Sequence, residues 1–317
     1  MNAAPKPSYP AAVSLHRQEP LIDAIAQLAA DASFEIAARD AASLEAARDT
    51  IAPGTTISVT WLPGDASDDL VAAARAIREA GYAPLPHVAA RRLRDQREAE
   101  RLIGRLHGEA GARGLFVIGG DVATPAGEFA SALELLARLR PMLRRYDRLG
   151  VGGYPEGHPA IATAILEAQL DTKIAVIEDL GAVPFVITQF GFEAAAIVRW
   201  LEAFRARANA APVRVGLAGP TSIGTLLRFA RLCGVGASAR AVAGNGASLI
   251  RVLREAGPDP VIRELAEAGI GARHGPVALH LFPFGGLLRS AEWIAPVAQG
   301  RFRLGTRGFA PRVRISA

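Results

Sequence analysis

Short apolar runs alternate with longer amphipathic stretches along most of the chain. Each run is rich in branched or aromatic side chains, as in strands, and each is followed by a stretch in which apolar residues recur at helical spacing. Eight such units over about 280 residues predict parallel strands closed into a (β/α)8 TIM barrel, not an open sheet. The predicted strands are Ser33–Ala37, Thr55–Leu62, Ala83–Val88, Gly114–Gly120, Leu149–Gly153, Val183–Gln189, Pro212–Ala218 and Pro276–Phe282.

The helical stretches carry recognisable start and stop signals. The one after the second strand begins at Asp65 or Ser67, which are good caps, and ends before Gly81. The predicted helices are Leu21–Ala30, Ala41–Ile51, Asp65–Ala80, Arg94–Gly111, Ala126–Arg145, Ala160–Leu180, Glu193–Ala208, Thr221–Cys233, Ala237–Ala256, Pro260–Ala272 and Leu288–Ala298. The strand Ala83–Val88 contains internal prolines, which are expected only at a sheet edge or a strand end.

One barrel domain is predicted over residues 21–305 of the 317-residue chain, between a loosely ordered tail at 1–20 and a basic tail at 306–317. No apolar run reaches the roughly 18 residues of a membrane span. Met1–Pro20 lacks the apolar core of a signal peptide, so the cytoplasm is the expected location. The single cysteine, Cys233, excludes an internal disulfide, and its apolar surroundings predict a buried, inert thiol.

The formal charge of +5 comes mainly from arginine, and many arginines lie beside glutamates on helix faces exposed to solvent. Nucleic-acid binding would require basic residues interleaved with aromatics, but aromatics make up only 6% of the chain. We therefore expect no nucleic-acid partner. An electropositive site for an acidic small molecule is a better use of this charge.

The last residues of the predicted strands are mostly polar, although the strands themselves are apolar. Active sites of barrel enzymes lie at this carboxyl-terminal rim. Two of these residues, Glu35 and Asp121, follow or interrupt strongly apolar sequence, so burial is expected to raise the pKa of both carboxyls unless they are paired. The rim residues are Glu35, Thr60, His87, Asp121, Tyr154, Gln189, Gly219–Pro220 and Phe282.

Each candidate also has a structural interpretation that the residues alone leave open. Glu35 is either a general acid or a structural partner of Arg39, Asp121 is either functional or a cap, and His87 is either a core histidine or a ligand contact. The histidines lack metal-ligand spacing, so no metal site is predicted. A glycosidase built on Glu35 and Asp121 would require a groove rich in aromatics, but the chain has only three tryptophans and four tyrosines.

The loop Val151–Pro159, with the sequence VGGYPEGHP, joins a short apolar run to a long helical stretch. Its prolines make it rigid, and it presents a tyrosine, a glutamate and a histidine within five residues. These side chains suit acid–base groups, metal ligands or a wall of a cofactor site, while a plain helix-start loop is the simpler interpretation.

Taken in order, several of these motifs resemble the methylenetetrahydrofolate reductase family, the (β/α)8 flavoenzymes of one-carbon metabolism. They follow the family's order and near-family spacing over roughly residues 31–300. The most specific are YPEGHP and ITQFGF within one barrel. The matching pieces are SFE at Ser33–Glu35, SVT at Ser58–Thr60, PH at Pro86–His87, GD at Gly120–Asp121, FAS at Phe129–Ser131, YPEGHP at Tyr154–Pro159, ITQFGF at Ile187–Phe192 and RFARLCGV at Arg228–Val235.

The resemblance implies interconversion of 5,10-methylenetetrahydrofolate and 5-methyltetrahydrofolate, with FAD as cofactor and NAD(P)H as co-substrate. Glu35 would be the general acid that opens the methylene bridge, and Asp121 would lie near flavin and pterin. The implied FAD-binding residues are Thr60, His87, Gly120, Asp121, Phe129, Ala130, Tyr154, His158 and Lys173. The implied substrate-binding residues are Glu35, Asp121, Gln189, Phe282 and Arg289.

Some positions depart from the family pattern. Gly119 replaces an arginine, Phe129 replaces a tyrosine, and the basic run expected on the helix after YPEGHP is reduced to Lys173. The chain is therefore expected to be a divergent member that works through FAD, and the sequence leaves open whether FAD is held tightly, weakly or not at all. Two alternatives follow: a flavin-independent reductase that transfers hydride directly from NAD(P)H, and a non-catalytic folate- or flavin-binding protein. NADH versus NADPH and the oligomeric state cannot be read from the sequence.

Overall fold

The computed structural model describes residues 18–232, 255–271 and 273–312. The predictions for Cys233, for residues 1–17 of the N-terminal tail and for most of the helix Ala237–Ala256 lie outside the described residues. No helix in the described part of the chain is both long and apolar enough to cross a membrane.

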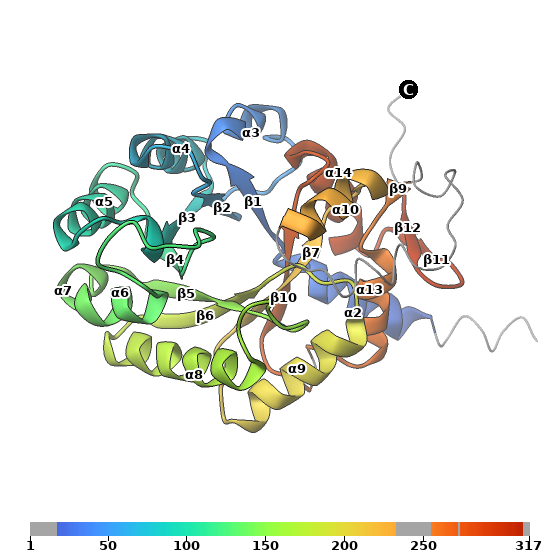
Figure 1. The fold of residues 1–317 in the computed structure, drawn as a ribbon. Helices are drawn as coiled ribbons and strands as arrows, with labels where there is room; N and C mark the ends of the chain where they lie inside the picture. The colour runs from blue at the N-terminus through green and yellow to red at the C-terminus, as the bar shows by residue number, and fades with distance from the viewer. Residues whose placement is uncertain (1–17, 233–254, 272, 313–317) are drawn as a thin grey trace, which may run out of the picture.

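Eight parallel strands close into a barrel, and helices follow them on the outside (Figure 1). The order around the barrel is β1-β10-β7-β6-β5-β4-β3-β2, so β1 closes the ring by pairing with both β2 and β10. The predicted single-domain (β/α)8 fold is confirmed. The barrel strands are β1 Ser33–Ala37, β2 Thr56–Thr60, β3 Ala83–Ala89, β4 Gly114–Ile118, β5 Arg148–Gly153, β6 Val183–Thr188, β7 Val213–Ala218 and β10 Val277–Phe282.

The prolines of β3 lie in a strand that pairs with neighbours on both sides, so this strand is not at a sheet edge. The N–H of Ala83 donates to the carbonyl of Thr55 on the β2 side. Because successive residues of a parallel strand bond to opposite neighbours, Pro84 and Pro86 turn their missing donors toward β4. Pairing between β3 and β4 begins only at His87, so neither proline removes a bond from that ladder.

The helices lie close to the predicted ranges, with two main differences. The helix predicted over Ala126–Arg145 is in two pieces, because Ser131 caps a late start at Ala132 and Pro141 begins a separate turn. The helix predicted over Ala41–Ile51 is reduced to one turn. The helices are α2 Glu19–Ala30, α3 Ser43–Ala46, α4 Ser67–Glu79, α5 Gln96–Gly108, α6 Ala132–Arg138, α7 Arg140–Leu143, α8 Thr163–Asp179, α9 Ala194–Ala206, α10 Ile223–Leu232, α13 Asp259–Glu267 and α14 Leu287–Ala298, with 3-10 turns η1 Ala38–Asp40 and η2 Ala90–Arg92.

Two small antiparallel pairs lie outside the barrel. β8 (Thr221–Ser222) pairs with β9 (Glu255–Ala256), so the helix predicted through Ala256 does not reach its expected end. β11 (Phe302–Leu304) pairs with β12 (Phe309–Pro311), and Phe309 is buried against the body of the protein. Part of the predicted basic tail is therefore a packed hairpin.

The middle of the barrel is filled with apolar side chains. Leu85, Phe116, Phe185 and Ile187 form a cluster separate from the main core, which lies between the strands and the outer helices. Gly150 makes room for it, because a Cβ atom there would lie 2.3 Å from Cζ of Phe185. This plug makes the barrel a packed core, and an active site is expected at the carboxyl ends of its strands.

Candidate active site

Glu35 occupies the centre of β1 and points into the barrel. Its neighbours Phe34 and Ile36 are buried in the opposite direction, against the helices, which follows from the two-residue period of a strand. The strand register aligns Glu35 with Ser58 of β2 and Ser33 with His280 of β10. The sequence SFEIA therefore brings one carboxyl group into an otherwise apolar strand, above the plug.

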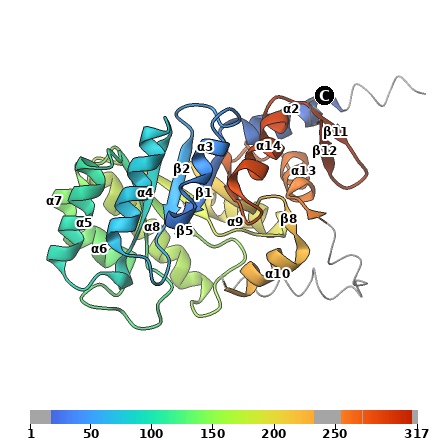
Figure 2. The same cartoon turned by 90° about the horizontal axis from the view of Figure 1, so that it is seen from above.

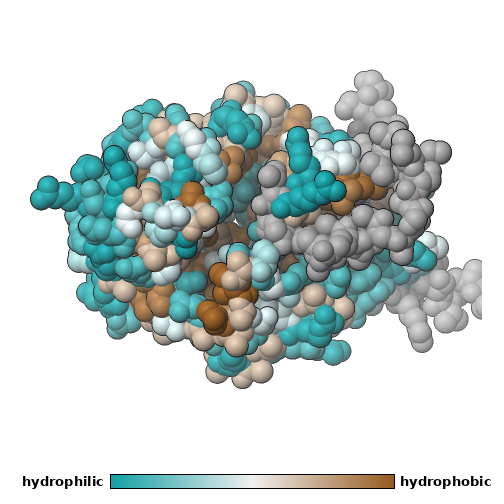
Figure 3. All heavy atoms as spheres, in the orientation of Figure 1, coloured by the Kyte–Doolittle hydropathy of each residue, from teal (hydrophilic) through white to brown (hydrophobic). Residues whose placement is uncertain are grey.

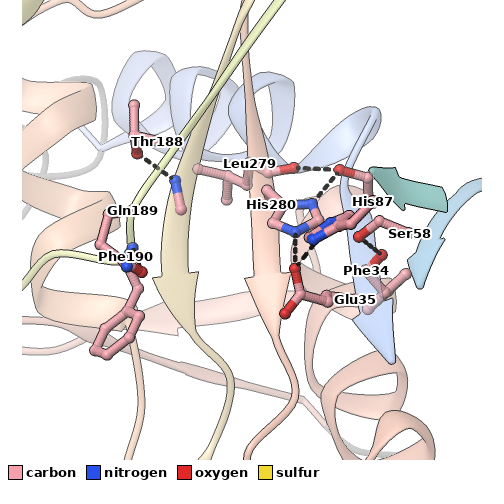
Figure 4. Close-up of polar contacts among 11 residues, drawn as sticks. Phe34, Glu35, Ser58, His87, Thr188, Gln189, Phe190, Leu279 and His280 are labelled. Atoms are coloured by element: carbon pink, nitrogen blue, oxygen red, sulfur yellow. Dashed lines mark hydrogen bonds and ion pairs between the residues drawn. The ribbon is translucent and has the colours of Figure 1, made fainter. Parts of the chain in front are cut away.

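Two histidines from other strands face this carboxyl (Figure 4). Oε2 of Glu35 lies 3.3 Å from Nε2 of His87 on β3 and 3.9 Å from Nε2 of His280 on β10. The Glu35 side chain is 18% exposed, whereas those of His87 and His280 are 6% and 1% exposed. The carboxyl can therefore meet a ligand from the mouth of the barrel while the histidines line its inner side.

Burial sets the charge states of these three groups. It raises the pKa of Glu35, although the nearby His87 acts in the opposite direction. Burial lowers the pKa of His87, and it lowers the pKa of His280 to about 3 with a smaller contribution from Arg214. The favoured state is a neutral carboxylic acid between two neutral imidazoles, which is the protonation state that a general acid requires.

Ser33 fixes the orientation of His280. The hydroxyl of Ser33 lies 2.8 Å from Nδ1 of His280 and donates to the carbonyl of Leu279 at 3.5 Å. Nδ1 of His280 is then the donor to Ser33, so its Nε2 is an acceptor directed at Glu35. Among the residues that the structure describes, Nε2 of His87 and of His280 have no hydrogen-bond partner, which leaves both able to exchange a proton with the carboxyl.

Sequence reasoning missed the part played by His280. Its position in the apolar run PVALHLF was visible, but its contact with Glu35 depends on the closure of β10 against β1 across the whole length of the chain. The alternative that Glu35 pairs with Arg39 does not describe the structure, because Arg39 is exposed in η1 and the contacts of Glu35 are with the histidines.

Asp121 lies three residues beyond the end of β4, after Gly120, whose φ of +98° favours glycine. The side chain of Asp121 is exposed, so the desolvation expected after an apolar strand does not occur there. Its charge acts on the guanidinium of Arg92, which also lies 4.6 Å over the ring of Trp61. Thr60, at the end of β2, is half-buried beside Ala37.

The YPEGHP loop follows β5 at the same rim. The ring of Tyr154 meets His158 edge-on at 5.4 Å, and burial raises the pKa of Tyr154. Oε1 of Glu156 accepts from the backbone N–H groups of Phe192 and Glu193 at 2.6 and 3.0 Å. Glu156 thus anchors the loop to the start of α9, which favours a structural role for this carboxylate.

The remaining residues predicted to bind FAD are less available. Phe129 is fully buried in the main core, with the guanidinium of Arg138 above its ring at 4.7 Å, so its side chain presents no surface to a ligand. The N–H of Ala130 donates to Glu134. Lys173 lies in the third turn of α8, where burial lowers its pKa.

The residues predicted to bind only the substrate lie at the rim near a cluster of aromatic rings. Gln189 is half-buried at the end of β6, and Phe282 ends β10 with its ring edge-on to His280 at 5.0 Å. Arg289 is half-buried in the first turn of α14. The sequence did not single out the cluster that Phe282 joins, which contains Phe190, Phe192, Phe229 and Phe284.

Among the residues that the structure describes, no group of three or more His, Cys, Asp or Glu side chains could hold a metal ion.

Comparison with known proteins gives the family. The model of the family "Methylenetetrahydrofolate reductase" matches residues 44–241, more than half of the 317-residue chain. The chain belongs to this family. A curated relative, "Methylenetetrahydrofolate reductase 2" of Saccharomyces cerevisiae, is 25% identical over 187 residues, which are 55% of this chain and 30% of the yeast protein. The match thus spans less than a third of the relative's length. Low identity to this relative fits a divergent member.

Two solved structures have a similar arrangement. A GH18 chitinase from Pseudoalteromonas aurantia is 10% identical with a TM-score of 0.49, covering 85% of this chain and 99% of its own. The 3-dehydroquinate dehydratase from Aquifex aeolicus VF5 is 9% identical with a TM-score of 0.39, covering 64% of this chain and 86% of its own.

Methylenetetrahydrofolate reductases generally bind FAD, so the residues after β5 can be compared with what binding of FAD requires. Residues 154–172, which form the loop after β5 and the first turns of α8, contain no lysine or arginine. Exposed apolar side chains, Ile161 and Ile165, occur there instead. The cavity between β5, α8 and α9 is about 10 Å³, lined by Glu167 and Trp200 among others, whereas ligand pockets of drug size span roughly 300–1,000 Å³.

These residues offer no cationic side chain to the diphosphate of FAD, and the donors that remain are the backbone N–H groups at the start of α8, which no side chain caps. Figure 3 shows hydrophobic side chains on the face toward which the strands point, beside the hollow of the barrel mouth. The rim residues Thr60, Gly120 and Tyr154 remain available for a flat ring. The FAD-binding residues stay a prediction, and residues 154–172 provide no basic side chain for that cofactor.

Proposed function

We propose that this protein interconverts 5,10-methylenetetrahydrofolate and 5-methyltetrahydrofolate, with NAD(P)H as the source of reducing equivalents. Membership of the family supports a folate-related reductase of one-carbon metabolism. The observation that carries the proposal is the buried carboxyl of Glu35, open to the barrel mouth and held between His87 and His280.

The reduction needs one proton and one hydride. Protonation of the nitrogen that leaves the methylene bridge opens the five-membered ring and gives an iminium ion on the other nitrogen. Hydride addition to the iminium carbon then forms the methyl group. A carboxylic acid supplies the proton, and burial raises the pKa of Glu35, which favours the protonated form that a general acid requires.

The histidines shape this step through their burial and position. Burial favours the neutral forms of both, and burial of Glu35 outweighs the charge effect by which His87 lowers the pKa of the carboxyl. Nε2 of His280 faces the carboxyl as an acceptor, and the carboxylate is reprotonated from the barrel mouth, to which the Glu35 side chain is 18% exposed. Ser33 holds the ring of His280 in this orientation.

Asp121 lies at the neighbouring rim position, exposed to solvent. We assign it a supporting role in orienting the pterin ring, whose nitrogens carry hydrogen-bond donors that a carboxylate accepts. Gln189 is the further polar candidate for this contact, because it lies at the end of β6 next to the aromatic cluster. Neither residue supplies the proton in this proposal.

A second candidate is direct hydride transfer from NAD(P)H to the folate, without a flavin. One observation favours it: residues 154–172 carry no basic side chain for a bound diphosphate, and Phe129 is buried in the core. NAD(P)H would bind only for the duration of a turnover, so it needs a weaker grip than a resident FAD.

Two measurements on the purified full chain test the proposal. The first follows NAD(P)H oxidation with 5,10-methylenetetrahydrofolate and identifies 5-methyltetrahydrofolate as product. The second records the visible spectrum of the same preparation, since a bound oxidised flavin is yellow. Product formation by a colourless enzyme supports direct transfer, and product formation by a yellow enzyme supports FAD. Absence of product with either nucleotide, and with added FAD, contradicts the proposed function.

A further inference from the structure

Two arginines face into the barrel at the amino-terminal ends of its strands, which form the floor of the barrel. Arg148 is the first residue of β5 and Arg214 is the second residue of β7. Arg148 precedes by two residues Gly150, which faces the plug, and Arg214 aligns with the plug residue Ile187, so both point inward. Figure 2 shows β1 pointing toward the side of α10 and away from α2, so the floor lies at the end opposite to the barrel mouth.

The side chain of Arg148 is held across the floor, directly below the plug. Its Nη2 donates to Oγ1 of Thr56 on β2 at 3.0 Å, and its guanidinium lies 5.9 Å from the centre of the Phe185 ring. Gly114 on β4 makes this path possible, because a Cβ atom there would lie 2.9 Å from Cγ and 3.0 Å from Nε of Arg148. The guanidinium therefore has a defined position before any ligand arrives.

Arg148 is half-buried and forms no ion pair with a residue that the structure describes. The two nearest acids have other partners, since Asp147 pairs with Arg113 at 2.9 Å and Asp31 pairs with Arg214 at 2.6 Å. Burial lowers the pKa of Arg148, and the charge of Arg214 lowers it further, against opposite contributions from both acids. Because a guanidinium stays protonated in proteins, a partly desolvated cation remains there without an anion in contact.

The barrel interior supplies no counter-ion for this charge. Glu35 is the only acidic residue in the eight barrel strands, all of which the structure describes, and the plug separates it from the floor. The inward residues next to Arg148 are small instead, as Gly114, Ala83 and Ala278 illustrate, and both alanines are half-buried. Solvent, and with it a small ion, therefore reaches the guanidinium from below.

We propose that the floor binds a tetrahedral oxyanion, either inorganic phosphate or the phosphate group of a small metabolite, at Arg148 and Thr56, with Arg214 adding positive charge. Arg148 has five N–H donors, and the described residues accept from only one of them. A guanidinium binds two phosphate oxygens at once in a fork, and the hydroxyl of Thr56, which accepts from Arg148, has its own proton left to donate. An anion at this position compensates a charge that the fold leaves without a contact.

This site is separate from the proposed reaction and does not depend on it. The plug lies between the floor and Glu35, so an anion at the floor does not compete with a substrate at the mouth. The guanidinium is only half-buried, so binding is expected to weaken as the salt concentration rises.

Isothermal titration calorimetry of the full chain with inorganic phosphate, at constant ionic strength, tests the proposal. Wild type is expected to bind phosphate saturably. Arg148→Gln removes the guanidinium, so the affinity should fall about tenfold or more, as expected for the loss of hydrogen bonds between charged groups. Thr56→Val keeps both arginines and the shape of the side chain but removes the hydroxyl, so a smaller loss of roughly threefold is expected.

A control variant locates the site, and a second ligand identifies the source of the phosphate. Arg228→Gln removes an exposed arginine from α10, at the opposite end of the barrel, and should leave the affinity for phosphate unchanged. AMP carries a phosphate group on a metabolite. Tighter binding of AMP than of inorganic phosphate assigns the site to a phosphate ester, and weaker binding of AMP assigns it to the free ion.

Three results would overturn the inference: no saturable binding of phosphate to wild type, an affinity that Arg148→Gln and Thr56→Val leave unchanged, or an equal loss in Arg228→Gln and Arg148→Gln. If Arg148→Gln does not fold, Thr56→Val decides alone, since an unchanged affinity in that variant contradicts the site. None of these measurements needs turnover, so failure of the floor site and failure of the proposed reaction are distinguished.

Discussion

Two sectors of the same barrel rim differ in whether their polar side chains are buried or exposed. At β1, β3 and β10, Glu35, His87 and His280 are buried together, and their contacts are with one another. At β4, β5 and the start of α8, the side chains are exposed or apolar, as Asp121 and Ile165 illustrate. The first sector has the desolvated carboxyl that proton transfer needs, whereas the second lacks the cations that a diphosphate needs.

The difference between the two sectors separates two requirements of the proposed reaction, proton delivery and tight cofactor binding. Proton delivery depends on a few side chains held inside the barrel, and these are present. Tight cofactor binding depends on charges along a helix outside it, and these are missing from residues 154–172. A chain can thus keep the first property without the second, which is why we assign the reaction to the Glu35 sector.

Replacing Glu35 with Gln should have the largest effect and tests most directly whether the two sectors differ. The variant keeps the shape of the side chain but cannot donate the proton, so kcat for folate turnover should fall by about 10²- to 10⁴-fold. The matched variant Asp121→Asn, in the exposed sector, should lose considerably less. Steady-state assays of both proteins decide the matter, and equal losses would show that the two sectors share the chemistry.

Replacing Glu156 with Ala tests the structural role of the YPEGHP loop. The change removes the acceptor of two backbone N–H groups at the start of α9, so the free energy of unfolding should fall by about 1–3 kcal/mol. Chemical denaturation measures this loss. Glu202→Ala, an exposed change on the same helix, should cost far less. An unchanged free energy of unfolding in Glu156→Ala would contradict the structural role and favour a functional role for this carboxylate.

The buried sector also makes stability depend on pH in a definite direction. Burial lowers the pKa of His87 and His280 from 6.5. Their contribution to the free energy of unfolding is therefore fully present above pH 6.5 and is lost as the pH falls below that value. Burial raises the pKa of Glu35 from 4.5, so its contribution is present below 4.5 and is lost as the pH rises through the higher folded value.

The variant Glu35→Gln should therefore gain stability over wild type as the pH rises, by about 1.4 kcal/mol for each unit of the pKa difference. Urea unfolding of both proteins across the pH range measures this gain. A constant difference between the two proteins would mean that Glu35 ionises in the folded protein as it does in the unfolded chain.

The exposed sector gives the smallest expected effect. Lys173→Met removes the one lysine of α8, but this side chain is half-buried and its pKa is lowered, so it serves poorly as a phosphate partner. Cofactor content and the KM for NAD(P)H should change by less than roughly twofold, within the range of ordinary surface substitutions. Loss of bound flavin in this variant would restore the predicted FAD site.

The alternation of apolar runs predicted the barrel well, because each strand is buried on both faces and therefore shows in the sequence. Most strand ends agree within two residues, as β1 and β5 show. The break at Pro141 and the β8–β9 pair were missed because they depend on local capping and on contact between distant segments.

The site was predicted in part. Glu35 was found because a carboxylate inside an apolar strand is unusual, but His280 and Phe229 were not, since their roles arise only when β10 closes against β1 and α10 packs on Phe284. Asp121 was expected to be buried, and the turn at Gly120 carries it to the surface instead.

The central claim is that Glu35 is a neutral carboxylic acid in the folded protein near neutral pH. Infrared spectroscopy detects the carbonyl stretch of a protonated carboxyl directly, and the difference between wild type and Glu35→Gln isolates the contribution of this residue. The account predicts a protonated-carboxyl band in wild type at neutral pH that is absent from the variant and disappears as the pH is raised. A difference spectrum with only the bands of an ionised carboxylate at neutral pH would contradict it.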